Sequence, residues 1–263
     1  MDLVYYPVIA ITKALFAAQG LRFTMTGCEN VPRRGGAVVA INHTGYFDFT
    51  HAGNATLQRR RFIRFMAKES IFHHPVGGPL MRGMKHIPVD RAAGGSAYLA
   101  AVAALRSGEL VGVYPEATIS RSFELKAFKP GAARMAQEAG VPILPTIVWG
   151  AQRVWTKDHP KRMGRTNTPI FVDIGAPITV GADEHPVAAT DRLKTAMAAQ
   201  LEAVWAAYPP VPEEELVFVP QRMGGRAPTL EQAEELYRQE LARKAAKRAA
   251  KAAQRSQEPG ADR

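Results

Sequence analysis

The stretch "AVVAINHTGYFDF", residues 37–49, holds both the strongest strand signal and the first candidate for chemistry. Its five apolar residues, Ala37 to Ile41, form a run of the length expected for a strand. His43 follows that strand, and Asp48 lies five positions further on, where we expect a helix to begin. The intervening loop can fold back so that the carboxylate accepts a hydrogen bond from one imidazole nitrogen. The other nitrogen is then available as a general base.

Outward from this stretch, short apolar runs alternate with segments of helical periodicity. We expect Ser96 to cap a helix that ends at Gly108, and Pro130 to open a helix that ends at Gly140. A later helix is expected at about 190–208. Strands interleaved with helices predict an α/β domain. The expected strands are Ala37–Ile41, Phe62–Ala67, Lys85–Val89, Leu110–Tyr114, Ile143–Trp149 and Ile170–Ile174.

The segment "YPPVPEEELVFVP", residues 208–220, ends the alternating pattern with four prolines and three consecutive glutamates. Beyond it, Thr229 and Gln232 have the spacing of a capping box at the start of a helix. That helix is acidic in its first half and basic in its second, and its apolar residues are mostly alanine. We therefore predict three parts: an N-terminal helix at 1–20, a catalytic domain at 21–210, and a linker with a charged C-terminal helix at 211–263.

Charge and cysteine usage narrow the range of partners. The 263 residues carry a formal net charge of +10, so an anionic partner is expected. No aromatic residues alternate with the C-terminal basic run, which argues against nucleic acid. The basic half-helix is either a solvated helix or an attachment to an anionic membrane surface. Cys28 is the only cysteine, which excludes an internal disulfide and a cysteine-cluster metal site.

The N-terminal apolar run, from Leu3 to Ala18, is too short and too interrupted for a helix that spans a membrane. An interfacial helix fits it better, with Tyr5, Tyr6 and Phe16 at the headgroup boundary. Packing of the helix on the domain's own core is the alternative.

Two further clusters follow predicted strands. "YPEATISRS", residues 114–122, places Glu116, Thr118 and Arg121 in a loop after a strand, where α/β sheets usually hold ligands. "HIPVDR", residues 86–91, ends in Arg91, and arginine suits a bidentate phosphate contact. A salt bridge from Arg91 to Asp90 or Glu116 is the simpler structural alternative.

Taken together, these blocks resemble the lysophosphatidic acid (1-acylglycerol-3-phosphate) acyltransferases, a family of glycerolipid acyltransferases. "NHTGYFD" matches the family's N-H-x-x-x-x-D block, and "GPLMRGMKHIPVDR" looks like the block that ends in F-I-x-R. "YPEATISRS" is similar to F-P-E-G-T-R-S, and "VPILP" to V-P-[IV]-[IV]-P. The resemblance covers about residues 20–180. Two positions depart from it, since Ala117 stands at a usual glycine and Ile119 at a frequent arginine.

The resemblance implies an α/β fold with a central mixed sheet flanked by helices, a membrane-interacting N-terminal helix and a basic C-terminal helix. It implies that His43 is the general base and Asp48 its orienting partner. It further implies an acceptor phosphate site in which Glu116 supports Arg91. Gly45 would allow close approach of the thioester. No metal and no cofactor are implied, because acyl-CoA is a substrate. The phosphate-site residues would be Arg91, Glu116 and Thr118, and the supporting residues Asn42, Gly45, Lys68 and Arg121.

The expected reaction moves a fatty acyl group from acyl-CoA or acyl carrier protein to 1-acylglycerol-3-phosphate, making phosphatidic acid for phospholipid synthesis. The expected location is the cytoplasmic side of the cell membrane, as a peripheral or monotopic protein. Another acceptor is the first alternative: a glycolipid, another lysophospholipid or glycerol phosphate. The other two alternatives are a lipid-binding protein with a vestigial His–Asp pair and a hydrolase that activates water with His43.

Overall fold

A mixed sheet of seven strands organises the chain, and the predicted α/β class is confirmed. The computed structural model describes residues 4–90 and 94–257. The strand order is β1-β7-β6-β2-β5-β3-β4. Strands β2 to β6 are parallel to one another, whereas β7 is antiparallel to β6 and parallel to β1. The strands are β1 (Arg22–Thr26), β2 (Ala37–Ile41), β3 (Ile63–Lys68), β4 (Ile87–Val89), β5 (Leu110–Val113), β6 (Ile143–Trp149) and β7 (Pro169–Ile174).

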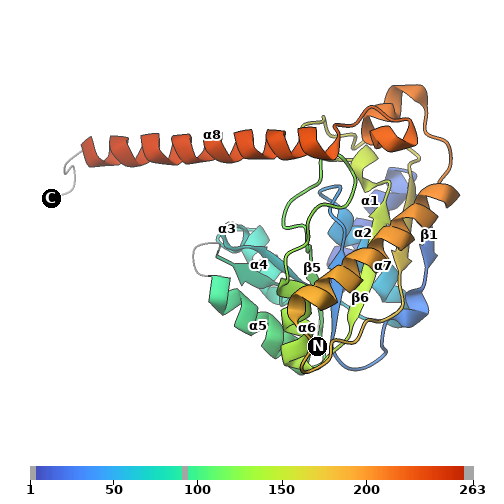
Figure 1. Cartoon of the computed structure of the whole chain (residues 1–263), viewed down its shortest axis with the longest axis vertical. Helices are drawn as coiled ribbons and strands as arrows, with labels where there is room; N and C mark the ends of the chain where they lie inside the picture. Colours follow the sequence, from blue (N-terminus) through green and yellow to red (C-terminus); the bar gives the residue numbers. More distant parts are fainter. Residues whose placement is uncertain (1–3, 91–93, 258–263) are drawn as a thin grey trace. The chain divides into compact units, whose positions relative to one another are not determined.

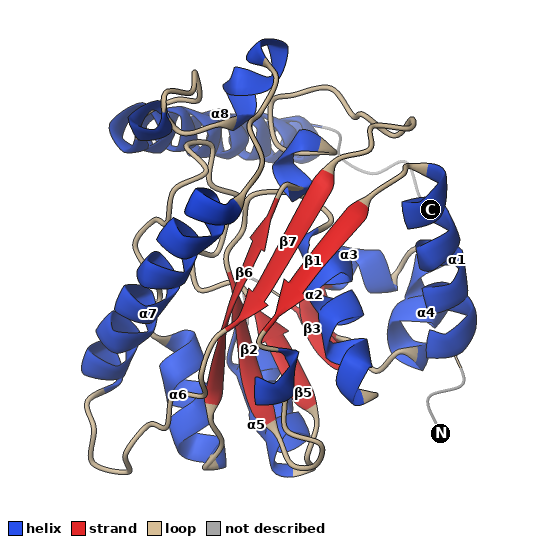
Figure 2. Cartoon of the chain, turned by 90° about the vertical axis from the view of Figure 1, so that its right-hand side faces the viewer, coloured by secondary structure: helices blue, strands red, loops and turns tan. Residues whose placement is uncertain are grey.

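Helices cover both faces of this sheet. Figure 2 shows α6 and α7 on one side of it and α1, α2 and α4 on the other. The α-helices of the described residues are α1 (Tyr5–Ala18), α2 (Asp48–Thr56), α3 (Glu69–Phe72), α4 (Gly77–Gly83), α5 (Gly94–Arg106), α6 (Gly131–Ala139), α7 (Pro186–Ala207) and α8 (Leu230–Gln257).

The chain divides into two compact units. Unit 1 comprises residues 1–120 and 125–211 and holds the whole sheet, together with α1 to α7. Unit 2 comprises residues 121–124 and 212–263 and includes α8, the long helix drawn in red in Figure 1. The division after residue 211 lies one residue beyond the boundary that the prolines predict.

The centre of the sheet follows directly from apolar sequence. Every residue of β2 and of β6 is buried, as expected for parallel strands covered by helices on both faces. Both strands have the predicted bounds. The edge strand β1 was not predicted, and its alternate residues are exposed. Pro130 and Gly140 do flank α6, and Gly140 adopts the left-handed conformation typical of a helix end. Ser96, in contrast, lies inside α5 rather than at its cap.

Helix α1 has one face on the core and one in solvent. Tyr5 and Phe16 are buried, and the Tyr5 hydroxyl donates a hydrogen bond to the Ile63 carbonyl oxygen at 2.7 Å. These two rings therefore face the protein and not the headgroup boundary predicted for them. Tyr6 and Ile11 are 63% and 70% exposed. Within residues 4–90 and 94–257, none of the helices combines the length and apolar character needed to cross a bilayer.

In unit 2, the predicted capping box opens α8. The Thr229 amide donates to Gln232 Oε1 at 2.9 Å, and the Gln232 amide donates to Thr229 Oγ1 at 3.2 Å. Arg121 pairs with Glu240 of this helix at 2.9 Å.

His51 is a buried imidazole on α2 without a hydrogen-bond partner for either ring nitrogen among the described residues. The rings of Phe16 and Phe23 surround it, with centroids 5.1 and 5.5 Å away. Burial lowers the pKa of His51 from 6.5 to about 3, so the folded protein holds the ring neutral.

Replacing His51 by leucine should therefore raise the free energy of unfolding, by about 1–3 kcal/mol at pH 7. Between pH 6.5 and 3 the unfolded imidazole binds a proton that the folded one does not, so the wild type loses stability as the pH falls. The advantage of the variant should grow by about 2 kcal/mol between pH 7 and 5. Urea unfolding of the wild type and the variant at pH 7 and at pH 5 measures this difference in the free energy of unfolding. The exposed His73→Leu is the control, and an advantage independent of pH would contradict the assignment.

Candidate active site

The His43–Asp48 pair forms as predicted. His43 lies two residues after β2, and Asp48 is the first residue of α2. The carboxylate oxygen Asp48 Oδ2 lies 3.0 Å from His43 Nδ1 and also accepts the amides of Thr44 and Gly45 at 2.8 and 2.9 Å. Burial raises the pKa of Asp48, while the hydrogen bonds from His43 and the two amides lower it again. One oxygen thus fixes both the loop and the imidazole.

The second ring nitrogen of His43 remains available for a substrate. Nδ1 donates to the carboxylate, which makes Nε2 the basic nitrogen of the neutral ring. The side chain of His43 is 17% exposed, and no described residue hydrogen-bonds Nε2. Tyr114, directly after β5, stacks on the ring with centroids 3.9 Å apart and planes 17° apart. The arrangement can accept a proton at a fixed position.

Glu116 holds the main chain around His43. Its Oε1 accepts the His43 amide at 2.9 Å, and its Oε2 accepts the Lys126 amide at 3.1 Å. Burial raises the pKa of Glu116 to about 7, against the lowering effect of these two hydrogen bonds. The Ser120 amide donates to the His43 carbonyl oxygen at 2.8 Å. The loop after β5 is therefore tied to the loop after β2.

Asn42 and Gly45 support the same loop by different means. The Asn42 side chain donates to the Val148 carbonyl oxygen at 3.0 Å and accepts the Val148 amide at 2.7 Å, which joins the end of β2 to β6. A Cβ on Gly45 would lie 3.0 Å from the Ala151 carbonyl group and 3.1 Å from the Trp155 oxygen. Gly45 thus allows close packing against the main chain of a neighbouring segment.

The predicted phosphate-site residues are only partly brought together. Thr118 lies beside Glu116 in the loop after β5, and its Oγ1 is 2.5 Å from Lys126 Nζ. Arg91 lies outside the described residues. Arg121 belongs to unit 2, where it pairs with Glu240. Ala117 adopts a left-handed φ of 63°, a conformation that suits the glycine usual at this position and strains an alanine.

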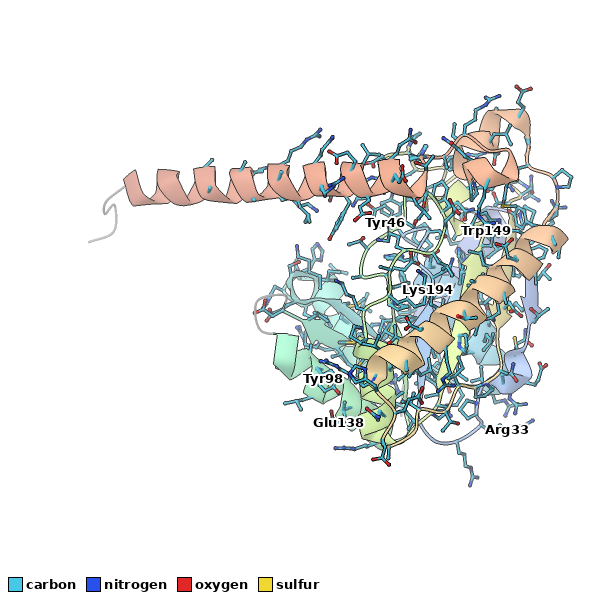
Figure 3. All side chains as sticks on the ribbon, viewed as in Figure 1. Arg33, Tyr46, Tyr98, Glu138, Trp149 and Lys194 are labelled. Carbon is cyan, nitrogen blue, oxygen red and sulfur yellow. The ribbon has the colours of Figure 1, made fainter. Side chains whose placement is uncertain are left out.

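A cavity of about 410 Å³ lies beside Tyr114 and Ala117, with Lys68 and Lys129 in its wall. Lys68 is the last residue of β3, and Tyr98 of α5 lines the cavity as well. The Tyr98 hydroxyl donates to Glu138 Oε2 of α6 at 2.7 Å, and Figure 3 shows the two side chains close together. This bond joins the helices that flank the cavity.

A second cavity, of about 270 Å³, is mostly apolar and lies between α1, α2 and α4. Phe49, the residue after Asp48, lines it from α2, Phe65 from β3 and Leu80 from α4. His43 and Asp48 line neither cavity, but Tyr114 of the first cavity stacks on the His43 ring. Sequence reasoning missed three residues here: Tyr114, Lys126 and Lys129. Tyr114 carried a signal, because it follows a buried strand.

Two curated proteins are similar to part of this chain. The 1-acyl-sn-glycerol-3-phosphate acyltransferase of Bacillus subtilis is 32% identical over 123 residues, 46% of this chain and 60% of the relative. The enzyme of that name from Borreliella burgdorferi is 28% identical over 147 residues, 53% and 56% of the two chains. The chain thus spans less than two thirds of these curated relatives.

The fold is shared with a solved structure, the 1-acyl-sn-glycerophosphate (LPA) acyltransferase PlsC from Thermotoga maritima. The TM-score is 0.60 at 20% identity, over 75% of this chain and 81% of the other. Residues 22–149 match the model of the family described as Acyltransferase. This segment runs from β1 to the end of β6 and includes His43, Asp48, Glu116 and Thr118. Through residues 22–149, just under half of its length, the chain is similar to the Acyltransferase family.

Proposed function

We propose that this protein transfers an acyl group from a thioester, acyl-CoA or acyl carrier protein, to the free hydroxyl of a 1-acylglycerol-3-phosphate. The product would be phosphatidic acid, for phospholipid synthesis. The observation that carries the proposal is the His43–Asp48 pair, buried at its carboxylate and open at Nε2, inside a segment that is similar to the Acyltransferase family. The names of the relatives from Bacillus and Borreliella support this choice of acceptor.

In the proposed reaction, His43 Nε2 takes the proton of the acceptor hydroxyl as its oxygen attacks the thioester carbonyl carbon. Asp48 stabilises the imidazolium that forms. The tetrahedral intermediate then expels the thiolate, which receives the proton from His43. Direct transfer is supported because no described Ser or Cys side chain hydrogen-bonds the His43 ring. Cys28 is buried, and burial together with nearby Glu29 and Asp173 raises its pKa.

The two cavities are suited to two different parts of the substrates, the acyl chain and the phosphate. The mostly apolar cavity beside Phe49 is suited to an acyl chain, because aromatic and aliphatic side chains form most of its wall. The cavity beside Tyr114 is suited to the acceptor's phosphate, because Lys68 and Lys129 line it. The His43 ring stacks on Tyr114, so the cavity suited to the phosphate lies beside the proposed general base.

A donor-by-acceptor panel tests the proposal. Wild-type protein is given acyl-CoA or acyl carrier protein with lysophosphatidic acid, other lysophospholipids, a glycolipid or glycerol phosphate, and free thiol is measured. We expect thiol release that requires lysophosphatidic acid and yields phosphatidic acid. Release independent of any acceptor would instead indicate a hydrolase. Binding to anionic vesicles without release from either donor would indicate a lipid-binding protein.

We further propose that unit 1 rests on an anionic membrane surface through α1, α3 and α4, which lie on one side of the sheet in Figure 2. Exposed apolar side chains on these helices and at the N-cap of α4 support this: Tyr6, Ile11, Ile71, Val76 and Leu80. Unit 2 can contribute on its own through the basic half of α8, because a basic residue near an anionic surface contributes about 1 kcal/mol. The protein would then lie on the cytoplasmic side of the cell membrane.

Ile11→Glu should weaken binding to vesicles of phosphatidylglycerol and phosphatidylcholine by about tenfold, because it places a charge on the apolar face. Sedimentation with the vesicles measures the bound fraction. Val187→Glu, at a 49% exposed position of α7, is the matched control. Equal binding by both variants would exclude α1 from the contact.

A further inference from the structure

The wall of the mostly apolar cavity contains a histidine whose two ring nitrogens have different surroundings. His86 directly precedes β4 and lines this cavity, and 9% of the residue is exposed. Its Nδ1 lies 3.0 Å from the amide nitrogen of Phe65. An amide N–H can only donate, so Nδ1 is the acceptor of this hydrogen bond. The hydrogen of the neutral imidazole is therefore on Nε2.

The imidazole of His86 stays neutral at pH 7. Burial, together with the positive charge of nearby Arg64, lowers the pKa of His86 from 6.5 to about 4. The hydrogen bond from Phe65 fixes the tautomer, and the lowered pKa keeps a second proton off the ring. Nε2 consequently acts as an N–H donor and not as a base.

The N–H of Nε2 is accessible from the cavity. Among the described residues, Nε2 has no hydrogen-bond partner. Protein atoms do not enclose it either, in contrast to both ring nitrogens of His51, which are buried without a partner. Since His86 lines the cavity, a group bound there can reach this donor. A purely apolar group that covered the donor would leave it unsatisfied, which costs free energy.

Most other polar side chains of this wall are already bound to main-chain groups. The hydroxyls of Tyr5, Thr12 and Thr50 donate to carbonyl oxygens at 2.7, 2.8 and 2.7 Å. The guanidinium of Arg61 donates to three further carbonyl oxygens. The remaining polar residues of the wall are more exposed than the histidine: Lys13 and Asn54.

A row of aromatic rings leads along the wall from the first turn of α2 to His86. Phe49, the residue after Asp48, contacts Phe65 with ring centroids 5.6 Å apart. Phe65 in turn contacts His86 with centroids 5.7 Å apart. All three rings line the cavity. A fatty chain that enters the cavity beside Phe49 therefore meets His86 only after it has passed Phe65.

His86 is also distant from the proposed general base along the direction of the strands. Phe65 pairs with Gly112 of β5, and Gly112 pairs with Val39 of β2, so the three residues lie at one level of the sheet. The His86 ring, in contact with Phe65, lies near this level. From Val39 to His43 the chain advances by about 13 Å at strand spacing. A chain that reacts at His43 would thus reach His86 with its distal part.

We propose that the His86 N–H donates a hydrogen bond to an oxygen on the fatty chain in this cavity. The protein would then select chains that carry a hydroxyl or keto group in their distal part. This role rests on the proposed function, in which the cavity holds an acyl chain. The oxygenated chain can belong to the acyl donor or to the lysolipid acceptor, because both contain a fatty chain.

His86→Asn removes the donor with little disturbance of the main chain. The asparagine oxygen can replace Nδ1 as the acceptor of the Phe65 amide, but no group takes the place of Nε2. The measured quantity is the kcat/KM for 12-hydroxystearoyl-CoA divided by that for stearoyl-CoA, with lysophosphatidic acid as the acceptor. We expect the wild type to favour the hydroxylated donor, and the ratio to fall about tenfold in His86→Asn, as for one lost hydrogen bond.

Two control variants accompany this measurement. His86→Gln should keep most of the preference, because its amide nitrogen can replace Nε2 as a donor. His73→Asn, at a side chain 75% exposed, should keep the wild-type ratio. A second arm uses stearoyl-CoA with lysophosphatidic acid that carries a 12-hydroxystearoyl or a stearoyl chain. A fall confined to one arm identifies the substrate whose chain His86 contacts. Unchanged ratios in both arms would overturn the assignment.

Displacement of a fluorescent fatty acid measures the same selectivity without acyl transfer. We expect 12-hydroxystearate to displace the probe from the wild type at a lower concentration than stearate, and His86→Asn to lose this difference. Equal displacement by both acids in the wild type would refute the role of His86. A wild type that keeps the binding preference but transfers no acyl group from any donor would refute the proposed function alone, so the two failures are distinct.

Discussion

His43→Ala should lower the rate of acyl transfer by about 10²- to 10⁴-fold, the usual contribution of a general base. In the proposed reaction Nε2 of the imidazole takes the proton of the acceptor hydroxyl, and no described Ser or Cys side chain hydrogen-bonds the ring to act in its place. The loss should appear in kcat for every acceptor that supports transfer, because each needs its hydroxyl deprotonated. Free thiol release from acyl-CoA, followed under saturating lysophosphatidic acid, measures the effect.

The fold should survive this substitution. The loop around residue 43 is held by main-chain groups: the His43 amide bonds to Glu116, and the His43 carbonyl oxygen accepts from Ser120. The unfolding midpoint in urea should therefore stay near the wild-type value. His73→Ala, at a side chain 75% exposed on the surface, is the control for the loss of an imidazole as such. A variant at position 43 that turns over at the wild-type rate would remove the imidazole from the mechanism.

Asp48→Ala should reduce transfer by a similar factor and, in contrast to His43→Ala, should also destabilise the protein. Asp48 Oδ2 is the acceptor for the imidazole and for two buried amides, those of Thr44 and Gly45. Without it, each buried donor that is left unsatisfied costs about 1–3 kcal/mol. Urea unfolding and thiol release on the same preparation measure the two effects.

Asp48→Asn separates the two roles of this residue. The asparagine oxygen can still accept the two amides, so the loop and the free energy of unfolding should be largely retained. The negative charge is lost, and the imidazolium formed during transfer is no longer stabilised. We expect the kcat of Asp48→Asn to lie between those of the wild type and Asp48→Ala. Equal stability of the Asn and Ala variants would contradict the anchoring role.

The double variant His43→Ala/Asp48→Ala tests whether the pair acts as one unit. Since Asp48 is proposed to act on the reaction through His43, its removal should cost little further rate once the imidazole is absent. A multiplicative loss in the double variant would mean that the carboxylate contacts the substrate independently.

The central part of the fold was predictable from the sequence, and the edges of the sheet were not. Apolar runs at 37–41 and 143–149 gave the bounds of β2 and β6 because strands buried on both faces need no polar alternation. The edge strand β1 has only weak apolar signal, since its pairing with β7 is decided by tertiary contacts. The same reason explains why the antiparallel orientation of β7 was not anticipated.

The candidate site was also only partly predictable from the sequence. The contact between His43 and Asp48 is local, five residues apart, and spacing was enough to predict it. The roles of Tyr114 and Lys126 depend on where the loop after β5 returns to the loop after β2, and no local pattern encodes that path. Glu116 was expected to hold Arg91, which lies outside the described residues; its observed partners are two main-chain amides.

The anchors of the site also have a consequence for how the protein acquires activity. The hydrogen bond between His43 and Glu116 joins residues 73 positions apart in the sequence. The hydrogen bonds between Asn42 and Val148 join residues 106 positions apart. Long closures form late because chain entropy opposes them until the intervening segments are ordered. A chain emerging from the ribosome thus contains the whole His–Asp motif long before it can hold it in place. We expect enzymatic activity to return in the slowest phase of refolding, after most of the secondary structure has formed.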